Sequence, residues 1–221
     1  MPVFGKGRTQ RKGPTIRKDH NEIARKLKKE RTVRETKKGI IWEFSHGSLS
    51  DVIKHLNYPI QEHIEHLLKR RKNPVIVDWG CGAGTAITTL AQQFPKARCY
   101  GFGDQRHPEW KTNEHAKLIW APAEDFRRYF KDNSIDFMYS HLGLTHLHNP
   151  VYVIGLLKKL RTGGTLVTGL VETSIFKGHV PEHMGRQIRK NGKTTVLLTL
   201  GDIRIRVHEI SPNNFEIRRI N

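Results

Sequence analysis

A glycine-rich segment, Gly80-Cys81-Gly82-Ala83-Gly84, limits the possible folds of this chain more than any other part of its sequence. It lies between an apolar stretch, Val75–Val77, which predicts a strand, and Thr85–Phe94, which predicts a helix. Glycine lets the backbone turn tightly and approach a ligand that a side chain would block. The first turn of the helix adds N–H groups that have no partner within the helix. The segment therefore predicts a ligand-binding loop between a strand and a helix.

Short apolar strands and helical stretches alternate from Pro74 onward, which predicts an α/β fold with a Rossmann-like, mostly parallel sheet and helices on both faces. A helix is expected over Asn149–Leu160. Further strands are expected at Arg98–Phe102, Leu118–Ala121, Ile135–Ser140 and Thr165–Leu170. The end of the chain changes character, because β-branched runs are separated by turn signals such as Gly201-Asp202. We therefore expect an antiparallel C-terminal end, formed by Thr194–Leu200, Ile203–Ile210 and Phe215–Ile220.

The charge of the chain is concentrated near its N-terminus. The formal net charge is +18, and residues 1–38 hold 14 basic residues against 4 acidic ones. We expect residues 1–38 to be a basic, flexible tail in which 19–38 permit a helix, so that the N-terminal extension is basic and helical. Residues 39–73 are expected to form a helical lid or platform, in which Ser48 and Asp51 resemble a capping box. Residues 74–221 are expected to form the core.

The glycine loop also carries a specific spacing. Asp78, Gly80, Gly82 and Gly84 read D-x-G-x-G-x-G, whereas a dinucleotide fingerprint reads G-x-G-x-x-G. The pattern resembles motif I of the class I S-adenosylmethionine-dependent methyltransferases, and the resemblance extends over about residues 74–172. It implies that the chain is an enzyme that binds S-adenosylmethionine at this loop. A nicotinamide-dependent dehydrogenase is disfavoured by the spacing.

Other segments resemble later motifs of the family in the right order. Asp104 follows the second strand and corresponds to the acid that holds the ribose, although many members have this acid one position earlier, where this chain has Gly103. Asp104 can equally be an exposed turn residue. The segment with Ala123 and Glu124 resembles the adenine-contacting segment, and its acids can alternatively cap the following helix. Ser140 ends the fourth strand, whose end faces the methyl group in this family.

Three histidines follow the fourth strand: His141, His146 and His148. Histidine suits a general base at neutral pH, which methyl transfer requires when the acceptor must lose a proton. The resemblance places His141 and His146 as candidate catalytic residues. Since the chain has 13 histidines, the same cluster can also be a set of surface residues at the start of a helix.

Several absences narrow the chemistry. The chain lacks an N/D-P-P-Y/F tetrad after strand four, which disfavours enzymes that methylate the amino groups of adenine and cytosine. It has no cysteine near strands four or five, which disfavours covalent attack on a pyrimidine carbon. The Lys-Asp-Lys-Glu set of many ribose-methylating enzymes is not recognisable either. Its two cysteines, Cys81 and Cys99, fit no metal-ligand pattern, so no metal site is expected. Buried free thiols, together with the lack of a membrane span or signal core, lead us to expect a cytoplasmic protein.

The basic tail favours RNA as the partner. We therefore expect a methyltransferase that acts on RNA. A methyltransferase of a small molecule or protein, and a non-catalytic nucleic-acid-binding relative, remain alternatives.

Overall fold

The computed structural model describes residues 33–36, 39–42, 47–141, 144, 150–169, 186–190, 193–211 and 214–221. The chain divides into two compact units, residues 1–43 and 44–221. In the first unit, strands β1 (Val33–Thr36) and β2 (Gly39–Trp42) pair antiparallel. At Val33–Thr36 the chain is thus a strand, within the range 19–38 for which a helix was expected, and β2 lies at the start of the range 39–73. The β-branched and aromatic residues of these segments favour strands.

The second unit is built on a sheet of nine strands in the order β5-β4-β3-β6-β7-β11-β10-β9-β8. The first five are parallel: β5 (Lys117–Trp120), β4 (Arg98–Gly103), β3 (Val75–Trp79), β6 (Ile135–Ser140) and β7 (Leu160–Gly169). The remaining four are antiparallel: β11 (Asn214–Arg219), β10 (Ile203–Ser211), β9 (Lys193–Leu200) and β8 (Arg186–Lys190). This is the mixed, Rossmann-like sheet that the sequence predicts. Only β8 has no counterpart among the expected strands.

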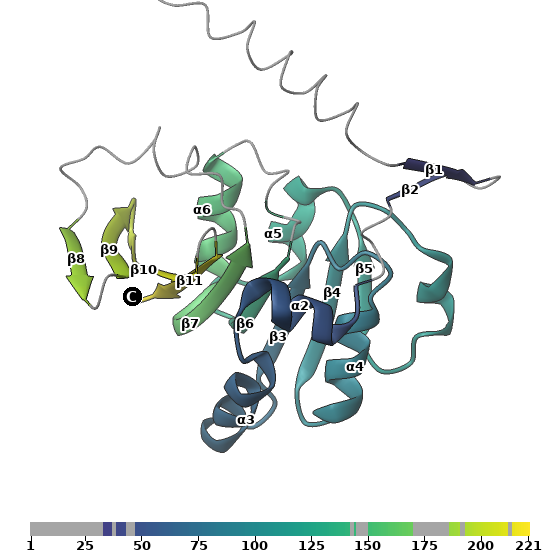
Figure 1. Cartoon of the computed structure of the whole chain (residues 1–221), viewed down its shortest axis with the longest axis horizontal. Coiled ribbons are helices and arrows are strands. Elements are labelled where there is room, and N and C mark those ends of the chain that lie inside the picture. Colours follow the sequence, from purple (N-terminus) through teal and green to yellow (C-terminus); the bar gives the residue numbers. More distant parts are fainter. Residues whose placement is uncertain are drawn as a thin grey trace, which may run out of the picture. The chain divides into compact units, whose positions relative to one another are not determined.

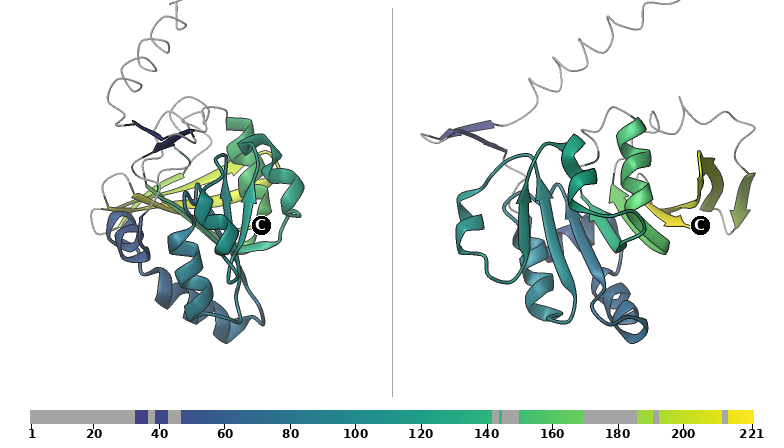
Figure 2. Two further views of the ribbon diagram at one scale, coloured as in Figure 1. Left: turned by 90° about the vertical axis from the view of Figure 1, so that its right-hand side faces the viewer. Right: turned by 180° about the vertical axis from the view of Figure 1, so that it is seen from behind.

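Helices cover both faces of the parallel half (Figures 1 and 2). One face carries α2 (Leu49–Leu56), α3 (Ile60–Arg70) and α4 (Thr85–Gln93), while α5 (Phe126–Tyr129) and α6 (Pro150–Lys159) pack on the other. Two short 3-10 helices, η2 (Pro108–Thr112) and η3 (Ala123–Asp125), lie in the connections. No helix among the described residues is long and apolar enough to cross a membrane.

Helices α2 and α3 belong to the core rather than to a separate lid. Leu56, Ile60 and Ile64 have no exposed surface and pack with Ile76 and Phe137 of the central strands. The capping box expected at the start of α2 is present, because Ser48 and Asp51 bond to each other's backbone. Residues 44–73 are therefore part of the same compact unit as the sheet.

Asp136, which is 4% exposed, lies at the N-terminal ends of the central parallel strands and holds them together. Its carboxylate accepts a hydrogen bond from the Val75 backbone N–H at 2.9 Å. It also pairs with the Nε atoms of Arg71 at 2.9 Å and Arg161 at 3.3 Å. Asp136 thus links β3, α3 and β7 far from the C-terminal strand ends, which is a structural role.

Candidate functional site

The order of the parallel strands reverses between β3 and β6, because β4 and β5 follow on one side and β7 on the other. In open α/β sheets, ligands bind at such a point, in the crevice outside the carboxyl ends of the strands. The glycine loop leaves β3 at this end, and Ser140 and His141 leave β6 at the same end. The fold therefore brings the two sequence motifs with the clearest chemistry to one crevice.

The loop adopts a backbone that requires glycine. Gly80, Gly82 and Gly84 have φ angles of 78°, 51° and 81°, in the left-handed region. A Cβ atom at Gly84 would lie 2.9 Å from Leu118 Cδ1, so a side chain is excluded by contact as well. The loop is fixed from outside by the Trp110 indole N–H, which donates to the Gly82 carbonyl at 2.9 Å. The structure thus has a glycine turn after β3, and the role of this turn in cofactor binding stays a prediction.

Asp78 lies in β3, whose five residues are all buried, directly beside Tyr139 of β6. The Asp78 side chain is 5% exposed, and burial raises its pKa to about 7 against the influence of Tyr139, which lowers it. The Tyr139 hydroxyl is fully buried and makes no hydrogen bond of standard geometry to any described residue. Burial and the charge of Asp78 raise the pKa of the nearby Cys81 thiol well above its ordinary value, so this thiol stays protonated. Asp78 is thus a buried acid that lacks a cationic partner among the described residues.

Asp104 lies just beyond β4, and its side chain is exposed. Its carbonyl accepts a hydrogen bond from the Trp120 indole N–H at 3.2 Å. Gly103, the preceding residue, is buried at the end of the strand. Asp104 is therefore at the expected strand end, and its part in ribose binding stays a prediction.

The third predicted segment forms the short helix η3. Ala123 is half-buried, and the Glu124 side chain is exposed. Asp125 precedes α5 without making a side-chain capping bond, and instead pairs with Arg128 at 3.0 Å. The alternative that these acids cap the helix by hydrogen bonding is thus not what the structure shows. Their role in adenine binding is untested and remains a prediction.

Ser140 is fully buried, and its hydroxyl accepts a hydrogen bond from the Leu144 N–H at 3.1 Å. This bond holds the turn that follows β6, so the hydroxyl is engaged in positioning His141. His141 itself is half-buried. The other two histidines of the cluster, His146 and His148, lie outside the described residues.

His141 has a partner that sequence reasoning missed. The His55 ring of α2 lies 4.5 Å from the His141 ring, centroid to centroid, at a tilt of 32°. Burial lowers the pKa of His141, His55 lowers it further, and Asp51 raises it. His55 Nδ1 donates to the Asp51 carbonyl at 2.7 Å. The two histidines are 86 positions apart, and only the packing of α2 against β7 brings them together.

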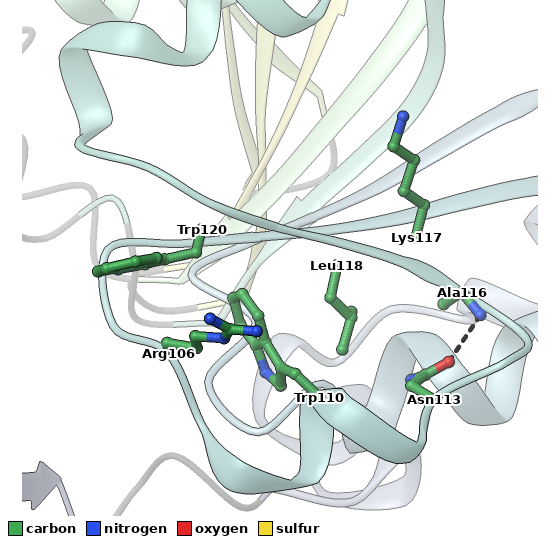
Figure 3. Close-up of a pocket in the computed structure, with 7 residues that line it drawn as sticks. All are labelled: Arg106, Trp110, Asn113, Ala116, Lys117, Leu118 and Trp120. Carbon is green, nitrogen blue, oxygen red and sulfur yellow. Dashed lines mark hydrogen bonds between the residues drawn. The ribbon is translucent and has the colours of Figure 1, made fainter.

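A pocket of about 370 Å³ lies along the edge strand β5 (Figure 3). It is lined by Arg106, Trp110, Asn113, Ala116, Lys117, Leu118 and Trp120. These residues belong to β5 and to its connection from β4, in which η2 is the only helical segment described. None of them comes from the loops after β3 or β6, but Trp110 bonds to Gly82 and Leu118 lies against Gly84, so the pocket adjoins the glycine loop.

The residues at the crevice fit S-adenosylmethionine on two observations. The cofactor has an ammonium group, and a cation is the partner that a buried carboxylate such as Asp78 needs to ionise at neutral pH. The positive φ angles of Gly80, Gly82 and Gly84 form a turn suited to glycine at the carboxyl end of β3, where ligands bind in such sheets. Asp78 and the loop from Gly80 to Gly84 would hold the amino-acid part. Among the described residues, no group of three or more His, Cys, Asp or Glu is arranged to hold a metal ion.

A family model described as a methyltransferase domain matches residues 77–168, from β3 to β7. No curated protein matches the chain in sequence.

Solved structures with similarity to the chain include three methyltransferases. The plantazolicin methyltransferase BamL is 21% identical, with a TM-score of 0.44 over 54% of this chain. The precorrin-6y C5,15-methyltransferase of Geobacter metallireducens GS-15 is 14% identical, with a TM-score of 0.45 over 81% of this chain and 91% of its own. An S-adenosylmethionine-dependent methyltransferase of Aquifex aeolicus is 15% identical, with a TM-score of 0.42 over 79% of this chain and 98% of its own. The chain spans 46% of the length of BamL.

The family match covers the whole parallel part of the sheet from β3 onward, including the glycine loop and the end of β6. The segment from β3 to β7 is therefore similar to a methyltransferase domain.

Proposed function

We propose that the protein transfers a methyl group from S-adenosylmethionine to RNA, with His141 as the base that accepts a proton from the acceptor atom. The charge supports RNA as the acceptor: the chain carries +18, of which +10 lies in residues 1–38. Such a concentration binds phosphate backbones independently of sequence and releases counterions when it does so. The position of His141 just after β6, the strand that pairs with β3, supports the catalytic role.

Bound S-adenosylmethionine supplies a methyl group activated by a positively charged sulfur. The chain contributes positioning and proton transfer. Its depressed pKa keeps His141 neutral at pH 7, so that its ring can take up a proton. The bond from Ser140 to the Leu144 N–H fixes the turn that carries His141.

His55 orients this base rather than replacing it. Because its Nδ1 donates to the Asp51 carbonyl, that nitrogen carries the proton and the ring is fixed on α2. The His55 ring packs against the His141 ring. After burial, His55 is a further cause of the lowered pKa of His141. We therefore infer that His55 is a positioning residue for the catalytic base.

The test is transfer of a labelled methyl group into separated pools of total RNA, protein and metabolites. We expect label in RNA, and the variant Gly82→Arg to abolish it because arginine would occupy the space of close backbone approach. Gly47→Arg is the matched control, since a Cβ at Gly47 would meet no atom within 4 Å.

Label entering only protein or metabolites would overturn the RNA assignment and leave the methyltransferase intact. Cofactor binding by calorimetry without transfer to any pool would support the non-catalytic alternative.

We also propose a cytoplasmic location, which is consistent with the two buried free thiols, Cys81 and Cys99. Fractionation of cells that express the protein tests this, and recovery in another compartment would contradict it.

A further inference from the structure

The antiparallel end of the sheet has two unlike faces. Strands β10 and β11 direct Ile203, Ile205, Val207 and Ile217 into the core beside α6. The alternate residues Arg204, Arg206 and Arg218 have exposed side chains on the opposite face. In Figure 1, strands β8, β9 and β10 extend beyond the helices that cover the parallel half. The sheet thus presents arginines to solvent where the rest of the fold places helices.

These arginines are close neighbours. Arg206 is directly opposite Arg218 in the register of β10 and β11. Arg204 lies two residues from Arg206, about 7 Å along the same face. On the other side, Arg206 is opposite Leu197 and Arg204 is opposite Thr199, so β9 supplies no acid. Like charges directly opposite each other destabilise a sheet, and an anion bound across them would remove that cost.

The positive surface continues onto α3. His63 of α3 is half-buried, and its pKa falls to about 4, first because of burial and then because of the positive charges of Arg218, His66 and Arg70. Arg70 and Arg218 therefore both lie close enough to His63 to lower its pKa. We name the set Arg70, Arg204, Arg206 and Arg218 the arginine face.

Acidic residues do not neutralise this set. Among the described residues, no carboxylate lies within ion-pair distance of Arg70, Arg204, Arg206 or Arg218. The nearest acid on the same face of β11 is Glu216, whose influence is to raise the pKa of Tyr58, after the larger effect of burial. Glu62 and Glu65 of α3 are exposed. The charged groups that lower the pKa of His63, which lies between them, are all cations.

We propose that the arginine face binds the phosphodiester backbone of the RNA substrate, an inference that rests on the proposed function. Guanidinium groups bind phosphate oxygens through paired N–H donors and are less strongly hydrated than ammonium groups. One exposed hydrophobic side chain, Ile220, lies two residues beyond Arg218, whereas the anchors of protein interfaces are enriched in Trp and Tyr. The chemistry of the arginine face therefore favours a polyanion, and RNA over an acidic protein.

The arginine face is connected to the crevice by β11. Asn214, at the start of this strand, donates from Nδ2 to the His55 carbonyl at 2.7 Å. Four residues later the strand reaches Arg218, a distance of about 14 Å. Each strand of duplex DNA has one phosphate per roughly 3.4 Å, and at that spacing about four nucleotides of RNA would connect the arginine face to His141 and His55.

The experiment compares the full chain with the variant Arg204→Gln/Arg206→Gln/Arg218→Gln. The matched control, Arg98→Gln/Arg127→Gln/Lys131→Gln, removes three exposed cations from other parts of the same unit. Binding of a fluorescently labelled 20-nucleotide single-stranded RNA is measured by anisotropy from 50 to 300 mM salt. Calorimetry with S-adenosylmethionine checks that the crevice is unchanged.

We expect the arginine variant to bind at least tenfold more weakly at low salt. Its plot of log affinity against log salt should be shallower by about two, because each lost phosphate contact on a single strand contributes about 0.7. The control should change the slope by less than one. Equal slopes for the variant and the full chain would overturn the inference. It would also be overturned if the substitutions changed only self-association, measured by sedimentation, or only the binding of an acidic peptide.

The two proposals fail separately. If labelled methyl enters RNA but the arginine variant binds RNA as the full chain does, the function stands and the arginine face is not its RNA surface. If the variant loses RNA binding while no label enters RNA, the arginine face is an RNA-binding surface and the proposed substrate is wrong.

Discussion

At the scale of single residues, the site combines groups whose ionisation is set by burial. Asp78 and His141 are both displaced toward their neutral forms. The sequence predicted both residues, one from its position before the glycines and the other from its position after the fourth strand. It did not predict His55, because a contact across 86 positions leaves no local pattern.

The pH dependence of methyl transfer tests His141. A base works in its neutral form, so kcat/KM should rise with pH through the pKa of His141 and level off above it. His55→Asn removes an influence that lowers this pKa, so the acid limb should move to higher pH. His141→Gln should lower the rate by about 10²–10⁴-fold and remove the limb. An exposed control, His115→Asn, should leave the profile unchanged, and an unaltered limb in His141→Gln would contradict the role.

The stability of the fold should depend on Asp78. Its pKa is about 7 in the native state against 3.8 for the unperturbed group. Between these values the unfolded chain loses the proton and the native chain keeps it, so the unfolding free energy falls as pH rises through this window. Asp78→Asn has no proton to lose and should be the more stable protein at pH 8, by up to a few kcal/mol, while binding S-adenosylmethionine more weakly.

Urea denaturation of both proteins at several pH values between 5 and 8 measures the effect of Asp78. The advantage of the variant should grow across this range, and the exposed control Asp104→Asn should show no such trend. A variant less stable than the native protein at pH 8 would show that the carboxylate has a stabilising partner.

At the scale of elements, the sequence predicts where α2 begins but not which strands it packs against. Its capping box was evident as Ser48 and Asp51, and both reciprocal bonds are present. Which strands α2 covers depends on long-range packing of Leu49, Val52 and Leu56. The same limit applies to β1 and β2, where residues compatible with a helix form two antiparallel strands that contain β-branched residues such as Val33, Ile40 and Ile41.

Loss of the cap should loosen α2 and with it His55. Ser48→Ala removes the hydroxyl that accepts the Asp51 N–H, at a cost of about 1 kcal/mol of helix stability. Amide hydrogen exchange should accelerate over the first turn of α2, and kcat should decrease modestly because His55 is less well held. Ser50→Ala keeps both box bonds and is the control. Equal exchange in the two variants would show that packing alone holds the helix.

At the scale of the whole molecule, the sheet separates two tasks. The parallel strands form the crevice at their reversal point, and the antiparallel strands extend the sheet into an exposed surface. The strand types were predictable, because a β-branched run between turn signals and an apolar run before a helix differ in sequence. The face on which Arg206 and Arg218 meet was not, because register is fixed by hydrogen bonds between strands and by burial of Ile205 and Val207.

The amino-acid sequence alone determined the glycine loop, the succession of strands and helices and the concentration of positive charge, since each depends on local backbone preference or on composition. Tertiary structure decided that His55 meets His141, that Asp78 keeps its proton near neutral pH and that arginines of two strands share one face. These properties arise from burial and from contacts between distant segments, which exist only once the hydrophobic faces of the sheet and helices have packed.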